Sequence, residues 1–310
     1  MNFFSGNGWT AEDIPDMEGK KAIVTGANSG LGFEASRELA RKNTHVVMAC
    51  RSLSKGREAK QDIEDEVDEA SLEVRKLDLA SLNSVQEFAE EYKANNDVLH
   101  VLCNNAGVMA LPRQETEDGF EQQFGVNHLG HFALTGLLFN VLRNTEESRV
   151  VTQSSALHET GSIHFEDLMM EENYDKWEAY AQSKLANILF AYELDRRTDE
   201  VSSIVCHPGY ADTSLQYRGP EQEGSKFKLG MAKAANKILG QKASKGALPL
   251  LYSATSAEAE SGDYIGPGGL LNMRGTPEKQ ESSEESYSEE TAEALWTLSE
   301  ALTDVKYGFE

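Results

Sequence analysis

The sequence predicts an α/β protein with a single doubly wound domain, in which helices cover both faces of a parallel sheet. Short apolar runs rich in β-branched residues alternate with helix-like stretches between residues 21 and 206. A glycine-rich turn also joins the first run directly to the first helix. Strands separated by helices pair in parallel, and ligands bind beyond their carboxyl ends. Functional residues are therefore expected just after each strand.

The elements follow in order along the chain. The expected strands are Lys21–Thr25, His45–Cys50, Leu72–Leu77, Val98–Cys103, Arg149–Gln153 and Ser202–Cys206. The first helix carries Leu31, Ala35 and Leu39 at helical spacing, and a charged second helix ends near Asp68. Further helices are expected at about Ser84–Lys93, Gly125–Arg143, Tyr174–Arg197, Ala247–Ala254 and Ala292–Leu302.

Two segments depart from the alternation. Residues 214–245 form a lysine-rich segment, in which an apolar stripe at helical spacing is expected beside basic side chains. Its lysines are Lys226, Lys228, Lys233, Lys237, Lys242 and Lys245, and its stripe is Phe227, Met231, Ala234 and Ile238. Thr276–Glu290 is acidic and serine-rich and is expected to be solvated. We therefore divide the chain into a main α/β domain, 1–275, and an acidic C-terminal extension with a short helix, 276–310.

Composition excludes several classes of protein. The chain has 310 residues, of which 39% are apolar, and 52 acidic against 29 basic residues give a net charge of −23. This charge repels nucleic-acid phosphates, so no nucleic-acid partner is expected. A heavily hydrated acidic surface suited to high salt is an alternative use of the surplus.

Nothing in the sequence indicates export or membrane insertion. The N-terminal MNFFSGNGW lacks the basic stretch and apolar core of a signal peptide, and no apolar run reaches the ~20 residues of a membrane span. Cys50, Cys103 and Cys206 are widely separated and end apolar runs, which favours buried thiols over disulfides or a metal site. A cytoplasmic protein is expected.

The turn after the first strand is a candidate nucleotide site. Glycines there let the backbone approach a pyrophosphate, whose charge the free N–H groups of the following helix accept. The candidate residues are Gly26, Asn28, Ser29, Gly30, Leu31 and Gly32. On its own the pattern fits a structural turn equally well.

The end of the second strand bears on cofactor choice. An acidic residue there accepts a hydrogen bond from the ribose 2′-OH in many dinucleotide sites, but this chain has Arg51 and Ser52 instead. The guanidinium of Arg51 suits a 2′-phosphate, with Lys55 as a weaker helper, so NADP(H) is favoured over NAD(H). The alternative is that Arg51 is an ordinary solvated loop charge.

Tyr180 and Lys184 are four residues apart on an expected helix and so share one face. A nearby ammonium favours the phenolate and draws the pKa of tyrosine from ~10 toward working pH, as general acid–base catalysis requires. Such pairs are also common on helix surfaces without any catalytic role.

Several motifs together carry a family resemblance. They occur in the order TGANSGLG (25–32), NNAG (104–107), NHLGHF (127–132), YAQSKLANILF (180–190) and PG (208–209). With these motifs the chain resembles the short-chain dehydrogenase/reductase family over roughly Gly19–Gly269. Within that family it is similar to the retinol-dehydrogenase-like branch and to protochlorophyllide reductases.

The resemblance implies a Rossmann-type fold, a nicotinamide cofactor and roles for individual residues. Tyr180 would be the proton donor or acceptor, Lys184 would bias its pKa and bind the nicotinamide ribose, Ser155 rather than Ser154 would hold the substrate oxygen, and Asn127 would hold a water of the proton relay. The implied cofactor contacts are Asp78, Leu79, Asn104, Asn105, Ala106, Gly107, Pro208, Gly209, Thr213, Tyr180 and Lys184. Ala211 departs from the bulkier aliphatic usual in relatives, with only a small packing effect expected.

The predicted function is NADP-dependent hydride transfer between nicotinamide and a carbonyl or alcohol, of which an apolar one is a candidate substrate. A C=C reductase of the protochlorophyllide-reductase type is an alternative. A non-catalytic NADPH-binding redox sensor is another, but it would be expected to lose Ser155, Tyr180 or Lys184. The resemblance gives His128 and His131 structural roles, and no metal is expected. The resemblance also implies that residues 214–245 form a lid over the substrate pocket. A homo-oligomer and membrane contact by this lid remain open.

Overall fold

A computed structural model describes residues 8–209, 242–269 and 272–309. One eight-stranded sheet organises these residues, in the order β3-β2-β1-β4-β5-β6-β7-β8. Its strands are β1 (Lys21–Thr25), β2 (His45–Cys50), β3 (Leu72–Lys76), β4 (Val101–Asn104), β5 (Arg149–Gln153), β6 (Ser202–Cys206), β7 (Tyr264–Pro267) and β8 (Pro277–Gln280). All neighbours pair in parallel except β7 and β8. The predicted doubly wound α/β fold is therefore confirmed, with one antiparallel edge strand added.

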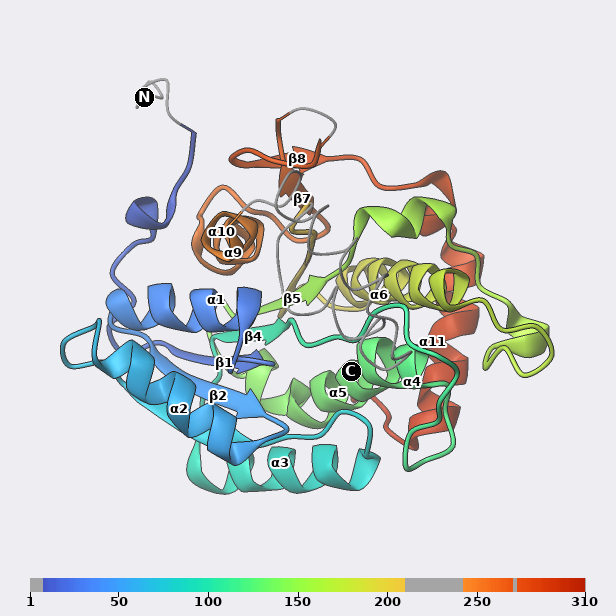
Figure 1. Ribbon diagram of the computed structural model, residues 1–310, viewed down its shortest axis with the longest axis horizontal. Helices are drawn as coiled ribbons and strands as arrows, with labels where there is room; N and C mark the ends of the chain where they lie inside the picture. Colours follow the sequence, from blue (N-terminus) through green and yellow to red (C-terminus); the bar gives the residue numbers. More distant parts are fainter. Residues whose placement is uncertain (1–7, 210–241, 270–271, 310) are drawn as a thin grey trace, which may run out of the picture.

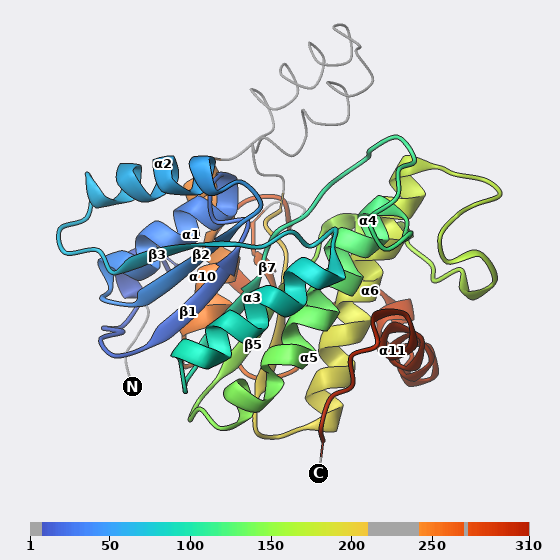
Figure 2. The same cartoon turned by 90° about the horizontal axis from the view of Figure 1, so that it is seen from below.

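Helices cover both faces of the sheet (Figures 1 and 2). One face packs against α1 (Gly30–Arg41), α2 (Leu53–Glu64), α9 (Ala243–Gly246) and α10 (Leu248–Thr255). The other packs against α3 (Leu82–Asn95), α5 (Gly130–Arg143) and α6 (Lys176–Arg197), with α4 (Gln122–Phe124) before α5. Both faces of the sheet are apolar, because successive side chains of a strand point to opposite faces. In β1, Ala22 and Val24 pack on the α1 side and Ile23 packs on the α3 side. The single-turn 3-10 helices are η1 (Ala11–Asp13), η3 (Ala156–Thr160), η4 (Phe165–Asp167) and η6 (Glu284–Tyr287).

The C-terminal residues add a third layer outside α5 and α6. Helix α11 (Glu289–Thr303) lies beside α6 (Figure 2). The Trp296 ring of α11 stacks on Phe190 of α6 with ring centroids 5.7 Å apart. Tyr307 then donates a hydrogen bond to the Phe132 carbonyl at 2.7 Å. Within the described ranges, no helix is both long enough and apolar enough to span a bilayer.

The prediction of a solvated segment at Thr276–Glu290 is wrong for Pro277–Gln280, which form the edge strand β8. The error has a physical cause. Strand β8 is held by backbone pairing to β7 and exposes Glu278 and Lys279, so it lacks the apolar alternation by which a half-buried strand is recognised. Charged side chains on an edge strand also discourage pairing with other chains. The domain boundary at residue 275 stays a prediction.

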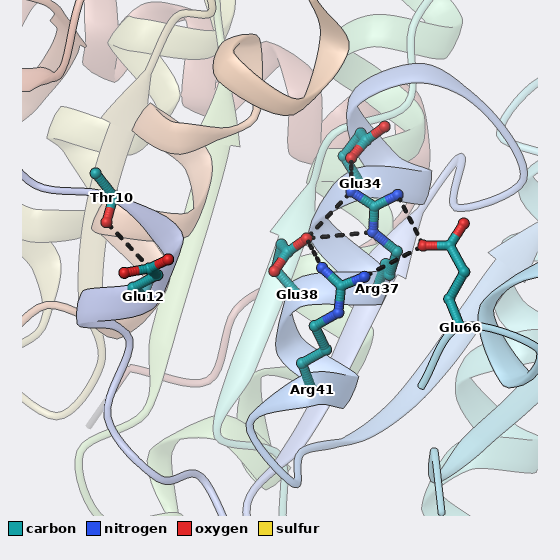
Figure 3. Close-up of polar contacts among 7 residues, drawn as sticks. All are labelled: Thr10, Glu12, Glu34, Arg37, Glu38, Arg41 and Glu66. Carbon is teal, nitrogen blue, oxygen red and sulfur yellow. Dashed lines mark hydrogen bonds and ion pairs between the residues drawn. The ribbon is translucent and has the colours of Figure 1, made fainter. Parts of the chain in front are cut away.

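A network of ion pairs ties α1 to Glu66 in the turn after α2 (Figure 3). Arg37 pairs with Glu34, Glu38 and Glu66, and Arg41 pairs with Glu38 and Glu66. Partial burial raises the pKa of Glu34, and Arg37 opposes that rise. A hydrogen bond from the Glu12 amide to the Thr10 hydroxyl caps η1 nearby. The acidic surface is thus locally organised around arginines in this part of the molecule.

Candidate active site

Glycines shape the turn between β1 and α1. Gly26 and Gly30 have φ angles of 69° and 57°, which L residues rarely adopt. A Cβ at Gly32 would lie 2.6 Å from both the Gly26 oxygen and Asn105 Nδ2, so only glycine fits there. Ser29 precedes α1 without a side-chain capping hydrogen bond. The first amides of a twelve-residue helix are thus left to an external acceptor, which fits a pyrophosphate.

Thr25 holds the turn after β4 against the turn after β1. Its hydroxyl accepts hydrogen bonds from the Asn105 and Ala106 amides, each at 2.9 Å. Asn105 Nδ2 donates to the Thr25 carbonyl at 2.7 Å. A Cβ at Gly107 would come within 3.1 Å of Asn127 Oδ1 and 3.7 Å of Lys184 Nζ. Backbone at Gly107 is therefore the close neighbour of two candidate catalytic side chains.

The ends of β2 and β3 hold the other predicted nucleotide contacts. Arg51 is exposed, and within the described residues its guanidinium has no hydrogen bond or ion pair, while its carbonyl accepts from Lys76 Nζ at 2.8 Å. Ser52 caps α2. Asp78 is half-buried and accepts from the Ala80 amide at 3.2 Å, and Leu79 is buried. These residues fit the adenosine end of a dinucleotide, with Arg51 available to a phosphate.

Ser155, Tyr180 and Lys184 come together beyond β5. Asp175 caps α6 through hydrogen bonds from the Trp177 and Glu178 amides, and α6 then buries both Tyr180 and Lys184. Lys184 Nζ donates to the Gln153 carbonyl at 3.1 Å and lies 5.7 Å from the Tyr180 ring centroid.

The two serines after β5 differ in orientation. Ser155 forms a side-chain hydrogen bond with Tyr180. Ser154 is buried and donates to the Lys184 backbone carbonyl at 2.8 Å. Its hydroxyl is thus engaged by the helix, so Ser155 is the serine that lies beside the phenol.

Burial dominates the protonation of both groups. It raises the pKa of Tyr180 to about 12, against an opposing hydrogen bond from Ser155, and lowers the pKa of Lys184 to about 8. The expectation that Lys184 draws the tyrosine pKa below its ordinary value is therefore wrong for this structure. Because removal from water disfavours both charged forms, the phenol keeps its proton at neutral pH.

Asn127 lies in a π-helical turn, η2 (Gly125–Leu129), that leads into α5. Its side-chain Oδ1 accepts a hydrogen bond from the Val108 backbone amide at 2.8 Å. Its Nδ2 donates to the Val108 carbonyl and to Ser183 Oγ, both at 2.9 Å. Its backbone carbonyl accepts from His131 Nδ1 at 3.0 Å. The side chain thus joins the turn after β4 to α6, and its role in holding a water stays a prediction.

The two histidines of the NHLGHF motif are fully buried. His131 Nε2 lies 2.9 Å from Thr25 Oγ1, and His128 Nε2 lies 2.9 Å from Ser299 Oγ. Burial lowers the pKa of His131 to about 4 and that of His128 to about 3, so both are neutral. Among the residues that the structure describes, no group of three or more His, Cys, Asp or Glu side chains could hold a metal ion.

The turn after β6 begins with Pro208 and Gly209. Gly209 has a φ of 62°, and a Cβ there would lie 2.3 Å from the Met273 oxygen. Thr213, Ala211 and the lid as far as residue 241 lie outside the described residues. Two lysines of the lid are described. Lys242 directly precedes α9, and Lys245 lies within it.

Sequence reasoning missed two residues at this edge. His158 and His207 are both buried. His158 follows the turn that carries Ser155, and His207 precedes the turn that begins with Pro208. His158 is three residues after Ser155 in the sequence, and His207 is the residue before Pro208. Their proximity in sequence to site motifs is the signal that could have singled them out.

A family model described as "short chain dehydrogenase" matches residues 20–224. The chain belongs to the short-chain dehydrogenase family. It is 40% identical to polyprenol dehydrogenase of Danio rerio over 304 residues, covering 95% of this chain and 90% of the relative. It is 39% identical to human retinol dehydrogenase 14 over 303 residues, covering 92% and 87%. These relatives put this short-chain dehydrogenase in the retinol-dehydrogenase-like branch.

The fold has a close counterpart among solved structures. A protein from Mycobacterium paratuberculosis is 38% identical and superposes with a TM-score of 0.80, covering 97% of this chain and 99% of that one. The short-chain dehydrogenase fold therefore extends over the described residues, and a nicotinamide cofactor is expected of every active member of this oxidoreductase family.

Proposed function

We propose that the protein is an NADP-dependent oxidoreductase that interconverts a carbonyl and an alcohol, with Tyr180 as general acid and base. One observation carries this proposal: Ser155, Tyr180 and Lys184 meet beyond β5, on the same sheet edge as the uncapped glycine turn. Ligands bind at this edge in doubly wound sheets. The site thus combines an anion-binding turn with a buried proton donor.

The protein's own groups would act in simple ways. Tyr180 keeps its proton at neutral pH, because burial raises the pKa of its phenol to about 12, and so it is ready to protonate an oxygen that gains negative charge. Ser155 would hold that oxygen beside the phenol. Lys184 is held by the Gln153 carbonyl at 3.1 Å and would supply positive charge nearby while it stays protonated. When bound, the nicotinamide supplies or accepts the hydride.

The cofactor would be NADP(H). Gly26, Gly30 and Gly32 would admit the pyrophosphate, and Arg51 with Lys55 would bind the 2′-phosphate. The exposed guanidinium of Arg51 supports this choice, since it has no competing partner among the described residues. An acid at the same position would repel the phosphate.

The substrate would be an apolar alcohol or carbonyl compound. Three of the exposed large hydrophobic side chains belong to residues close to site residues: Leu157 lies two residues after Ser155, Trp177 three residues before Tyr180, and the Met273 backbone lies against Gly209. The names of the relatives, polyprenol dehydrogenase and retinol dehydrogenase 14, also designate apolar alcohols.

Free, buried cysteines agree with a reducing cytoplasm as the location, and a homo-oligomer stays a proposal.

Replacing Tyr180 by phenylalanine tests the proposal. With a panel of apolar aldehydes and ketones, at low and at multimolar salt, NADPH oxidation by Tyr180→Phe should fall about 100- to 10,000-fold. The affinity for NADPH should stay within twofold of wild type, because the ring is retained. Tyr252→Phe on α10, on the opposite face of the sheet, is the matched control and should keep its turnover. Full turnover by Tyr180→Phe would exclude the proposed role.

A further inference from the structure

Two buried histidines connect the C-terminal segment to the turns of the candidate site. His158 lies in η3, three residues after Ser155, and His207 lies between β6 and Pro208. Both have less than 3% of their surface exposed. Their partners lie far away in sequence, on β8 and at the start of η6.

The hydrogen bonds of His158 fix its tautomer. Its Nδ1 lies 2.8 Å from the Ser155 carbonyl, which can only accept, so Nδ1 carries the proton. Its Nε2 accepts from the Ser283 amide at 3.1 Å, so Nε2 carries none. One neutral ring therefore joins the backbone of Ser155 to the backbone of Ser283, which are 128 residues apart in the chain.

His207 makes a second connection with the opposite tautomer. Gln280 Nε2 donates to the Pro267 carbonyl at 3.0 Å, which leaves its Oε1 as an acceptor for His207 Nε2–H at 3.0 Å. His207 Nδ1 is then free to accept from the Gly209 amide at 3.3 Å. The turn after β6 is thus held through His207 by a side chain of β8.

Tyr264 on β7 lies against both rings. It stacks on His207 at 5.2 Å between ring centroids, and it meets His158 edge-on at 5.3 Å. Burial lowers the pKa of His207 to about 4 and lowers the pKa of His158 as well, so both rings stay neutral at neutral pH. Neutral rings can accept from the two amides, whereas imidazolium rings cannot.

We propose that Pro277–Tyr287 is a positioning part of the active site, which holds the Ser155 turn through His158 and the Gly209 turn through His207. The inference rests on the proposed function, since it concerns the geometry of Ser155 beside Tyr180. Neither histidine touches substrate or cofactor in this scheme. Each histidine instead fixes a backbone group of a turn, and that turn contacts the substrate or the cofactor.

Proline and alanine at position 283 separate this role from general stability. The φ of Ser283 is −63°, a value that proline adopts, but Ser283→Pro replaces the amide hydrogen by a ring carbon that points at His158 Nε2, so it removes the donor and also pushes the His158 ring away. Ser283→Ala keeps that amide and removes only a buried hydroxyl that has no hydrogen-bond partner in the structure. The two variants therefore differ in whether the backbone of residue 283 can contact His158, and neither changes Ser155, Tyr180 or Lys184.

In Ser283→Pro we expect kcat to fall at least about fivefold, because the loss of one net hydrogen bond alone accounts for that factor, with KM for NADPH unchanged. Amide hydrogen exchange of residues 155–161 should also become about fivefold faster. Ser283→Ala should match wild type in both measurements. Equal exchange and equal kcat in the two variants would refute the positioning role.

A second variant covers the case in which proline prevents folding. His158→Asn retains a donor for the Ser155 carbonyl at the position of Nδ1 but has no atom that reaches the Ser283 amide. It should reproduce the faster exchange of 155–161, and wild-type exchange in this variant would overturn the inference. Hydrogen exchange needs no turnover, so its result stands even if Tyr180→Phe overturns the proposed function. A loss of turnover in Tyr180→Phe together with silent Ser283→Pro and His158→Asn variants would refute the positioning role alone.

Discussion

The turn after β1 and the turn after β5 lie at the same edge of one sheet, but they are held by different kinds of contact. The first is shaped by glycine backbone and by an uncapped helix start, all within residues 25–32. The second presents Ser155, whose carbonyl is held by His158 and, through it, by Ser283. Local sequence builds one turn, and distant segments complete the other.

This difference bears on how each turn tolerates change. A backbone cradle fails when any side chain is added, whereas a side-chain connection fails when a single donor or acceptor is lost. Steric damage in a packed turn costs about 1–3 kcal/mol, which exceeds the net worth of one hydrogen bond. The glycine turn should therefore give the larger effects.

Of these two turns, the one after β1 should give the larger effect, at Gly32. In Gly32→Ala the new Cβ would lie 2.6 Å from the Gly26 oxygen and from Asn105 Nδ2, so the turn must open. The Kd for NADPH should rise about 5- to 150-fold, as measured by fluorescence titration. Gly308→Ala, where nothing lies within 4 Å of the new Cβ, is the control. Unchanged affinity in Gly32→Ala would show that the cofactor does not bind over this turn.

Arg51 tests whether side chains contribute to the nucleotide side as well. Arg51→Ala should weaken NADPH binding about tenfold, because a charge-assisted hydrogen bond to the 2′-phosphate is lost. NADH binding should stay the same, and the ratio of the two Kd values is the measurement. Equal losses for both cofactors would assign Arg51 to general electrostatics rather than to the 2′-phosphate.

The pH dependence of turnover probes the buried catalytic side. The pKa of Lys184 is lowered to about 8, so its ammonium is present below that pH and lost above it, while Tyr180, with a pKa of about 12, keeps its proton throughout. For carbonyl reduction, kcat should fall several-fold as the pH rises from 7 to 9.5. Lys184→Met should have a lower kcat at pH 7 and no such fall. If the fall persists in that variant, another group titrates.

The same lysine affects stability with a defined sign. Its pKa in the folded protein lies below that of an exposed lysine, so the unfolded chain binds more protons between pH 8 and 10. This group therefore makes the folded state relatively more stable as the pH rises through that window, and less stable as the pH falls through about 8.

The smallest effect is expected at the ion pairs on the outer face of α1 (Figure 3). Glu66 accepts from Arg37 at 3.3 Å and from Arg41 at 3.2 Å, and about half of its side chain is exposed. Glu66→Gln should lower the free energy of unfolding by less than ~1 kcal/mol at low salt, and by less again at 1 M salt. Asp68→Asn, an exposed carboxylate without an ion pair among the described residues, is the control for urea titrations. Equal losses in both variants would mean that net charge, not pairing, matters there.

Local patterns were sufficient for much of this molecule. The predicted strands from Lys21–Thr25 to Ser202–Cys206 are all present within a few residues, because the apolar runs of the inner strands are buried on both faces of the sheet, whereas the edge strand β3 is buried only in part. Helix α6 begins at Lys176 rather than at the predicted Tyr174, because Asp175 caps its first turn. Strands β7 and β8 were not predicted, since four residues each and a charged edge leave little periodicity.

The sequence by itself determined the fold class, the glycine turn and the spacing that puts Tyr180 and Lys184 on one helix face. These are consequences of local backbone preference and of hydrophobic period, which act over a few residues. Only the tertiary structure decided that burial would raise the pKa of Tyr180, and that Gln280 and Ser283 would reach His207 and His158. Burial and hydrogen bonding between distant segments depend on how the chain packs, and no local pattern encodes that packing.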